Sequence, residues 1–493
     1  MPVSAATGSW REPARRSLAL APTIARTRCA AASPQRRYHH GVNPSPESAD
    51  FLPPDDSQRR ALHDEVHARP PALVALPALV TYLAVLNDGV TRQAEAEHLG
   101  HLPGQQALTV DDLQRNFLRL TLEHCSLKWE RHSEFTRYSI VQPLPPNAGL
   151  GMKQPDLSTP LAIDGAWLRA VPGRTVAAVQ LVMVAGALSD AAGVLAQGRG
   201  WLGAETGVIA SQMGAGREGA GQPGGGHSCA ITDFVLRADG FERCLVVAAP
   251  DTTPSRAGRI AQRLLELETY RLMALRGLPV AKSLAPMLAD AEAALAGITA
   301  RLEGTQTSEQ ALLAELIGLA ARVERATAQH MYRFSATRAY DALVLERIAE
   351  LREKALPGTQ TIGEFMQRRL APAIATVAAT AQRLASLSER VERAGALLRT
   401  RVDIATEAQN QQLLAKLTRG QELQLRLQST VEGLSIAAIS YYVVSLLLYG
   451  AKAAKLAGLS INPELTVGVL IPLVLWVVWR ATRRIHRRLQ GSD

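Results

Sequence analysis

A proline-free stretch constrains the fold of this chain more than any other feature. Between Pro372 and Pro463 there is no proline. The first part of the stretch has apolar residues at steps of three and four, the pattern of a helix with one packing face: Leu384, Leu387, Val391, Ala394 and Leu398. Residues 433–451 then contain no charged side chain, and a helix of roughly 19 residues, at about 1.5 Å per residue, nearly crosses a hydrocarbon core of about 30 Å. We therefore predict one helix of roughly 80 residues, a long stalk or coiled-coil helix over 359–432 that continues as a transmembrane helix over 433–451.

A second apolar segment, residues 459–480, follows this helix. It contains Pro472, and its Trp476 and Trp479 are of the residue type enriched at membrane interfaces. Arg480 ends this segment and four more arginines lie in a basic tail over 481–493, whereas the connection from Lys452 to Glu464 holds two lysines and one glutamate. By the positive-inside tendency we expect a two-helix transmembrane hairpin whose C-terminus lies in the cytoplasm with the bulk of the chain.

The formal net charge of +9 does not indicate nucleic-acid binding. The basic residues concentrate near the N-terminus and in the C-terminal tail, and no platform of basic and aromatic residues for stacking bases is visible. We therefore expect no nucleic-acid partner and expect the lipid bilayer as one partner. Four cysteines without a Cys-x-x-Cys pair fit a reducing compartment.

Residues 1–50 are rich in arginine, alanine, serine and proline and poor in acidic residues. We predict a disordered basic extension there. A transit peptide and a start codon assigned too far upstream are the alternatives.

Strand and helix patterns alternate over residues 51–276. A short helix is expected from Leu62 to before Pro70, and a second helix from a cap at Thr253 or Ser255 to Arg276. A crossing helix is expected over 187–195, and 92–102 and 110–116 read as helix or loop. Buried or alternating runs predict strands at 78–86, 118–122, 129–141, 175–184, 207–213, 228–237 and 241–249. We expect 118–122 and 129–141 to form one antiparallel hairpin, and the whole to be an α+β cytoplasmic domain.

Residues 277–358 show only helical periodicity and predict a helical bundle. Its expected helices are 284–302, 308–334 and 337–354, and Pro357 and Gly358 end it before the long helix starts at 359–364. The apolar stripe of the stalk helix has two interpretations: it is core for this bundle, or a seam for self-association or another protein partner.

Three polar clusters are candidate sites. The first surrounds His63 and His67, which are one helical turn apart, the second is the segment LKWERHSEF, and the third is GGHSCAITDF with His227, Cys229 and Asp233. If the first two meet in space, they form a histidine and carboxylate metal site, and its candidate ligands are His63, His67, Glu130 and His132. The alternative interpretation is structural, with Glu130 paired to Arg131 or Arg69 in a polar core.

No motif for catalysis or a cofactor is present. The chain lacks HExxH, GxSxG, Walker and dinucleotide-binding patterns, so the cofactor is unknown and an enzyme is the less favoured class. The glycine-rich residues 214–226 lack the Gly-Lys-Ser/Thr ending of a phosphate-binding loop, and we expect a hairpin connection there.

The chain resembles the domain of unknown function 3422 family, uncharacterised bacterial membrane-anchored proteins. The segments that carry the resemblance are LHDEVHARP, LKWERHSEF, TDFVLRADGF, RIAQRLLELETYRLMALRGLPVA, RFSATRAYDALVLERIAELRE, EFMQRRLAPA, LLRTRVDIATEAQNQQLL and LRLQSTVEGLSIAAISYY. The resemblance implies a bacterial inner (plasma) membrane and assigns no catalytic residue.

The order of parts is also similar to that of CorA-type divalent-cation channels. Those channels carry Gly-Met-Asn after the first span, where this chain has Tyr449, Gly450 and Ala451. The sequence of the channel filter is therefore missing.

The absence of catalytic and cofactor motifs beside a predicted membrane hairpin leads us to expect a non-enzymatic interaction or scaffold protein of the inner membrane. The alternatives are an oligomeric channel or transporter, with Ser440, Tyr441, Tyr442 and Ser445 lining the pore, and a metal-dependent hydrolase.

Overall fold

The computed structural model describes residues 56–60, 62–63, 70–145, 157, 161–203, 207–214, 226–304, 308–457 and 462–489. The chain divides into a first unit, Met1–Asp64, and a second, Glu65–Asp493. In the first unit, residues 59–60 and 62–63 are helical and His63 is exposed. The predicted extension over 1–50 and His67 lie outside the described residues.

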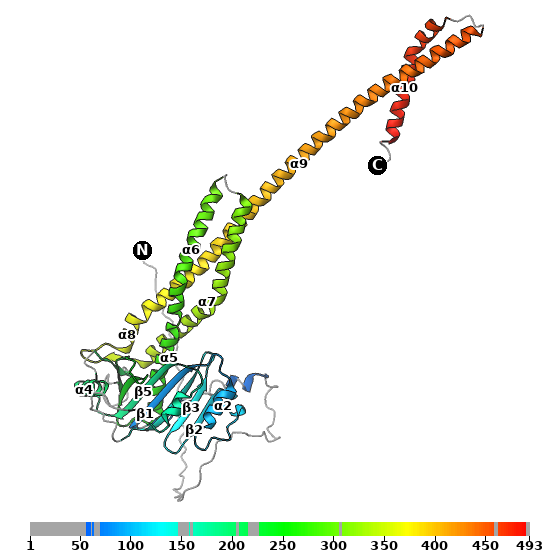
Figure 1. Cartoon of the computed structure of the whole chain (residues 1–493). Coiled ribbons are helices and arrows are strands. Elements are labelled where there is room, and N and C mark those ends of the chain that lie inside the picture. The colour runs from blue at the N-terminus through cyan, green and yellow to red at the C-terminus, as the bar shows by residue number, and fades with distance from the viewer. Residues whose placement is uncertain are drawn as a thin grey trace, which may run out of the picture. The chain divides into compact units, whose positions relative to one another are not determined.

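The second unit contains a nine-stranded mixed sheet with the order β2-β3-β4-β1-β5-β8-β7-β6-β9 (Figure 1). Neighbouring strands pair antiparallel except β5 and β8, which are parallel. The predicted α+β class is thus confirmed. The strands are β1 (Ala78–Leu86), β2 (Phe117–Thr121), β3 (Ser126–Arg131), β4 (Phe135–Pro143), β5 (Arg174–Ala185), β6 (Ile209–Met213), β7 (Ser228–Thr232), β8 (Glu242–Ala248) and β9 (Lys354–Ala355).

Two strand predictions were wrong in extent. Residues 129–141 are two strands, because the chain turns where the His132 N–H donates to the Phe135 carbonyl at 2.8 Å, so the predicted hairpin is a three-stranded meander. The strand predicted over 228–237 ends at Thr232. There the Thr232 hydroxyl accepts from the Phe234 N–H and Phe234 adopts a φ of 52°, which turns the backbone out of the ladder.

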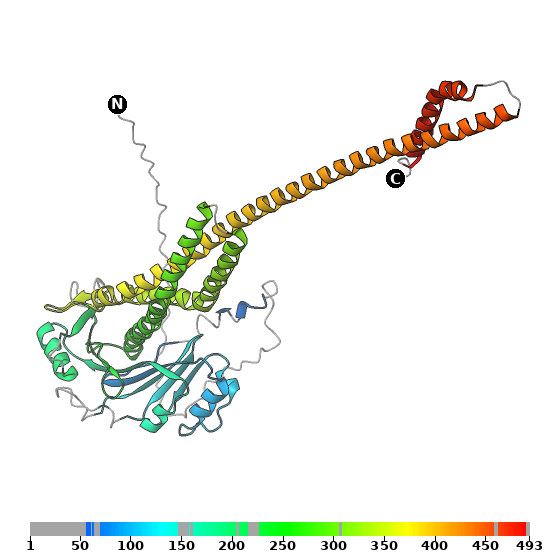
Figure 2. The same cartoon turned by 45° about the horizontal axis from the view of Figure 1, so that its top comes forward.

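Short helices and α5 cover the two faces of the sheet (Figure 2). One face packs on α5 (Pro254–Leu275), on the second half of α7 (Glu309–Leu351) and on α8 (Ile362–Arg369). The other face packs on α4 (Ala191–Leu202) at one end and on α2 (Arg92–Gly100), α3 (Gly165–Arg169) and the 3-10 helix η1 (Val110–Leu113) at the other. The expected cap of α5 is Thr253, whose hydroxyl accepts from the Arg256 N–H.

The expected helices 308–334 and 337–354 are one helix, α7, of 43 residues. Thr337, at the predicted start of the second helix, is buried, and its hydroxyl donates to the Ala274 carbonyl at 3.1 Å. A Cβ atom on Gly277 would lie 2.3 Å from that hydroxyl oxygen. The small and polar residues here therefore mark a close crossing of helices, not a helix end.

The long helix also starts differently from the prediction. Thr361 and Glu364 form a capping box for the short helix α8, which ends at Arg369. A separate helix, α9 (Ala371–Leu456, 86 residues), follows with Pro372 in its first turn, where its missing N–H costs no hydrogen bond. The single helix of about 80 residues predicted from the sequence is therefore α9 alone.

The predicted helical bundle consists of α6 (Gly277–Glu303), the first half of α7, and α9. Its core includes four residues of the sequence stripe, Leu384, Leu387, Val391 and Leu398, and Ala394 packs against it. The first part of the stripe is thus bundle core. After Arg401 many apolar side chains of α9 are exposed, among them Leu413, Leu417, Leu427 and Val431.

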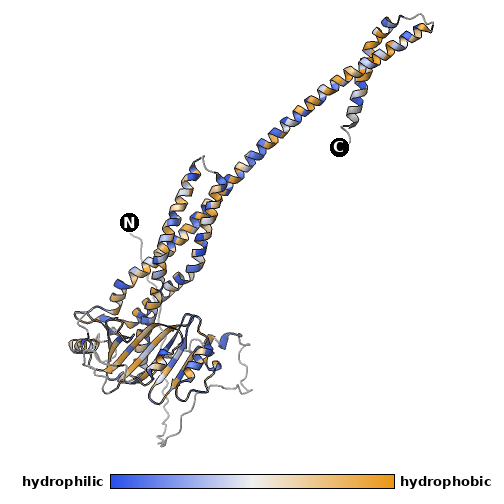
Figure 3. Cartoon of the chain, viewed as in Figure 1, coloured by the Kyte–Doolittle hydropathy of each residue, from blue (hydrophilic) through white to orange (hydrophobic). Residues whose placement is uncertain are grey.

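Two apolar helices lie near the C-terminus. By length and composition, the helix that ends at Leu456 and residues Pro463–Arg484 of α10 (Pro463–Leu489) could each cross a membrane. Figure 3 shows orange, apolar residues predominating toward the end of α9 and in α10. α10 packs against α9, where Ser440 and Val467 are buried.

Candidate functional site

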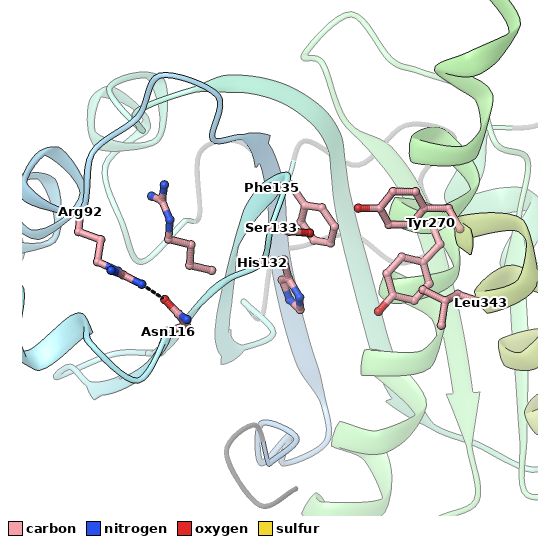
Figure 4. A pocket seen from close by; sticks show the side chains of 9 residues that line it. Arg92, Asn116, His132, Ser133, Phe135, Tyr270 and Leu343 are labelled. Carbon is pink, nitrogen blue, oxygen red and sulfur yellow. Dashed lines mark hydrogen bonds between the residues drawn. The ribbon is translucent and has the colours of Figure 1, made fainter. Parts of the chain in front are cut away.

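A cavity of about 530 Å³ lies beside the turn between β3 and β4, within the predicted segment LKWERHSEF. Its walls come from α2, the loop before β2, the β3–β4 turn, α5 and α7. The nine lining residues, none of which is Asp or Glu, are Arg92, Asn116, Arg131, His132, Ser133, Phe135, Tyr270, Tyr340 and Leu343. Figure 4 shows Arg92 and Asn116 on one side, Tyr270 and Leu343 on the other, and His132, Ser133 and Phe135 between them.

Arg131 is fixed by a buried carboxylate behind the cavity. Its Nη1 lies 2.5 Å from Oε2 of Glu95, and its Nη2 donates to the Val90 carbonyl at 2.8 Å. Glu95 also accepts from the Thr136 hydroxyl at 2.7 Å and is fully buried. Arg131 thus presents a guanidinium whose charge is balanced by one carboxylate.

Arg92 has no carboxylate partner in the described part of the chain. Its Nη2 donates to Oδ1 of Asn116 at 2.8 Å. Asn116 itself has a φ of 55°, an uncommon conformation for a residue other than glycine, and its carbonyl accepts from the Arg131 N–H at 3.0 Å. Non-glycine residues in this region of φ are concentrated at functional sites.

The β3–β4 turn places an aromatic surface in the middle of the cavity. The His132 ring stacks on Phe135 with centroids 4.6 Å apart. Asn87 donates to the His132 carbonyl at 2.8 Å and so holds the turn. Glu134, the remaining charged residue of the turn, pairs with Arg333 on α7.

Two tyrosines form the opposite wall. The rings of Tyr270 and Tyr340 have centroids 6.0 Å apart, and Phe135 lies 6.4 Å from Tyr340. Burial raises the pKa of Tyr270 and of Tyr340 to about 12. Both hydroxyls are therefore protonated at neutral pH and can donate hydrogen bonds to a ligand.

A buried charge cluster lies on the helix-facing side of the same strands and uses Glu130. Its carboxylate forms an ion pair with Lys128 at 3.1 Å and accepts a hydrogen bond from Arg137, and Arg137 also pairs with Glu266 of α5 at 3.0 Å. The expected pairing of Glu130 with Arg131 was wrong, because consecutive residues of a strand point to opposite faces and Arg131 pairs with Glu95 instead. Arg69 lies outside the described residues.

The four candidate metal ligands are placed as follows. Glu130 points into the buried charge cluster, His132 lines the cavity, His63 is an exposed residue of the first unit, and His67 lies outside the described residues. Within the described residues, no group of three or more His, Cys, Asp or Glu side chains could hold a metal. A metal site built from these four residues stays a prediction.

The third polar cluster does not form a common site in the structure. Cys229 is buried in β7, where burial raises the pKa of its thiol to about 12. Asp233 pairs with Arg237 at 2.5 Å, which closes the loop after β7. Cys229 and Asp233 therefore have structural roles.

Sequence reasoning missed most of the cavity wall. Arg92, Asn116, Tyr270 and Tyr340 come from four separate segments, whereas the segment that the sequence singled out supplies Arg131, His132, Ser133 and Phe135. Three of the chain's nine tyrosines occur in charged helical segments, and the two that line the cavity are those in ETYRL and RAYDAL.

Comparison with known proteins gives one match. A family model described as "Protein of unknown function (DUF3422)" matches residues 54–489. No curated protein and no solved structure matches the chain.

Proposed function

The chain belongs to the DUF3422 family, and we propose that it is a non-enzymatic protein anchored in the bacterial inner membrane, with its body and its C-terminus in the cytoplasm. The continuity of α9 carries this proposal. Leu384 and Leu398 of α9 are core residues of the bundle, and the same unbroken helix contains the uncharged residues 433–451. A membrane that binds the end of α9 would therefore also retain the helical bundle and the sheet domain.

The environment that suits the end of α9 is lipid. Leu434, Tyr441 and Leu446 are each about 70% exposed or more, although they lie in a segment without charge. Burial of such side chains away from water is worth about 1.5–3 kcal/mol each. α10 returns along α9, and its arginines follow Trp476 and Trp479, with Arg483 over the Trp479 ring at 4.6 Å. This order of residues favours a cytoplasmic C-terminus.

Membrane fractionation tests the anchor. The full-length chain should sediment with membranes and resist extraction at high pH. Val443→Arg/Leu446→Arg should release it, because each arginine near the middle of a span costs about 2.5–3.5 kcal/mol in insertion. Leu414→Arg, at an exposed position of α9 outside the uncharged segment, is the matched control and should stay bound. Wild-type protein in the supernatant without detergent, or a C-terminal reporter that responds from outside the cell, would contradict the proposal.

The exposed part of α9 supports a protein partner. Leu413, Leu417, Leu427 and Val431 recur at helical spacing and are each about 60% exposed. We propose that this face binds a second copy of the chain or another membrane protein. Leu417→Cys should give a disulfide-linked homodimer if the partner is a second copy, and Arg419→Cys, on the opposite side of α9, should not. Capture of a different protein from membranes, without a homodimer, would favour the other partner, and a ring-shaped oligomer in detergent would favour the channel alternative.

A further inference from the structure

We propose that the cavity beside the β3–β4 turn binds a small organic carboxylate with an aromatic body. The proposal goes beyond membrane anchoring and does not depend on it. Its support is the combination of Arg92, which has no carboxylate partner among the described residues, two protonated tyrosine hydroxyls and an aromatic wall around one cavity of about 530 Å³. Ligand cavities are typically about 300–1,000 Å³ and combine an apolar lining with a few placed polar groups.

The charge of the site selects a monoanion. Two arginines line the cavity, and the carboxylate of Glu95 balances one of them from behind. The remaining positive charge is that of Arg92, whose guanidinium is held by the Asn116 side chain at 2.8 Å. A planar guanidinium suits a carboxylate through paired N–H donors. A divalent cation is disfavoured, because both arginines would repel it.

The aromatic wall selects the body of the ligand. Phe135, Tyr270 and Tyr340 surround the side of the cavity that faces α5 and α7, and the His132 ring lies against Phe135. Phe135 is 1% exposed and both tyrosines are 9% exposed, so only small parts of these rings reach the cavity. A flat ring that packs on these parts makes aromatic contacts that an inorganic anion cannot make. The two tyrosine hydroxyls can donate to an oxygen substituent on that ring.

The rigidity of the walls supports a binding role. Arg131 is held by three neighbours, Glu95, Val90 and the Asn116 carbonyl. Asn116 keeps a left-handed backbone conformation in the same wall. A wall whose side chains are already oriented loses less conformational entropy when a ligand binds.

Calorimetric titration of the full-length protein in detergent tests the proposal. The probe is 4-hydroxybenzoate, with 4-hydroxybenzamide as the uncharged analogue and inorganic phosphate as the anion without a ring. We expect binding of 4-hydroxybenzoate in the micromolar to millimolar range and at least about tenfold weaker binding of the other two, because a charge-assisted hydrogen bond is worth about 1.5–3 kcal/mol.

Two variants localise the binding. Arg92→Gln should weaken 4-hydroxybenzoate at least about tenfold, and Tyr340→Phe should weaken it about threefold or more. Their matched controls are Arg259→Gln on α5, where Arg259 contacts Ser255, and Tyr332→Phe on α7, which is exposed. Both controls should bind as the wild type does, and circular dichroism should confirm that all four variants fold.

Three results would overturn the proposal. They are no binding of 4-hydroxybenzoate up to about 10 mM, preferred binding of phosphate, and binding that neither Arg92→Gln nor Tyr340→Phe changes. None of them bears on the membrane anchor, which fractionation tests separately.

Discussion

Replacement of Glu95 on α2 by alanine should strongly destabilise the protein. The Glu95 side chain is fully buried and holds both Arg131 and the hydroxyl of Thr136. Alanine has the best helix propensity, so α2 itself should not be weakened. The expected loss therefore comes from Arg131, which loses its carboxylate partner, and from the Thr136 hydroxyl, which loses its acceptor.

The magnitude follows from the burial of those partners. Breaking a buried ion pair costs about 3–5 kcal/mol, and the Arg131 side chain is 18% exposed, so water can reach it and the cost should be near 3 kcal/mol. Thr136 is fully buried, and the loss of its acceptor adds about 1 kcal/mol. A total of about 4 kcal/mol corresponds to a decrease in Tm of about 10 °C for a body of this size.

Near-ultraviolet circular dichroism of the full-length protein in detergent is the assay, since Trp129 and Trp167 lie in the core that α2 helps to form. Glu97→Ala, on the exposed side of α2, is the control and should change Tm by less than about 2 °C. The double variant Glu95→Ala/Arg131→Ala should be more stable than Glu95→Ala, because it no longer contains the unpaired charge. A Glu95→Ala protein with the Tm of Glu97→Ala would refute the reasoning.

Three further predictions concern titration and close packing. Burial lowers the pKa of His98 to about 4, so the free energy of unfolding should decrease by about 2–3 kcal/mol as the pH falls from about 6.5 to 4. His98→Gln should not show this decrease in acid unfolding titrations. Burial and the neighbouring Glu268 raise the pKa of Glu242 to about 8, so the free energy of unfolding should decrease as the pH rises from about 5 to 8. In Glu242→Gln the urea concentration at the midpoint of unfolding should change less with pH over that range. A Cβ atom on Gly258 of α5 would lie 1.7 Å from the Ala72 carbonyl oxygen, so Gly258→Ala should cost about 2–4 kcal/mol in denaturant unfolding. Gly297→Ala in α6, which has open space around the new Cβ, should be neutral or stabilising by up to about 1 kcal/mol.

Local periodicity predicted the strands and helices well where one environment acts along a whole element. The run at 78–86 matches β1 at both ends because the strand is buried on both faces and flanked by polar residues or proline. The stripe from Leu384 to Leu398 was recognised because every third or fourth residue meets the same core. The prediction of one strand over 129–141 was wrong because the alternation of apolar and polar residues continues through the turn at His132. A pattern of period two does not show where a strand changes direction.

The cavity could be predicted only in part, because its walls depend on tertiary structure. His132 was found from the sequence as a polar residue in a distinctive segment. Its neighbours Arg92 and Tyr340 are separated from it by roughly 40 and 200 residues, and no local pattern connects such positions. The partner of Glu130 could not be predicted from the sequence either. Arg137 lies on the next strand, and the register that pairs the two residues depends on the β3–β4 turn, which was not predicted.

The unbroken α7 gives this arrangement a physical consequence. Its first half packs on α9 through Leu316 and Val323, and its second half lines the cavity with Tyr340 and Leu343. Between the halves, Thr337 sits against Gly277, where not even a Cβ atom could be added without displacing it. Packed interiors are close to incompressible, so α7 cannot slide past α6 at this crossing without separating the two helices. If a ligand binds in the cavity as proposed, any movement that it imposes on Tyr340 must be absorbed by side-chain rotation or passed along α7 to α9, on which the first half of α7 packs.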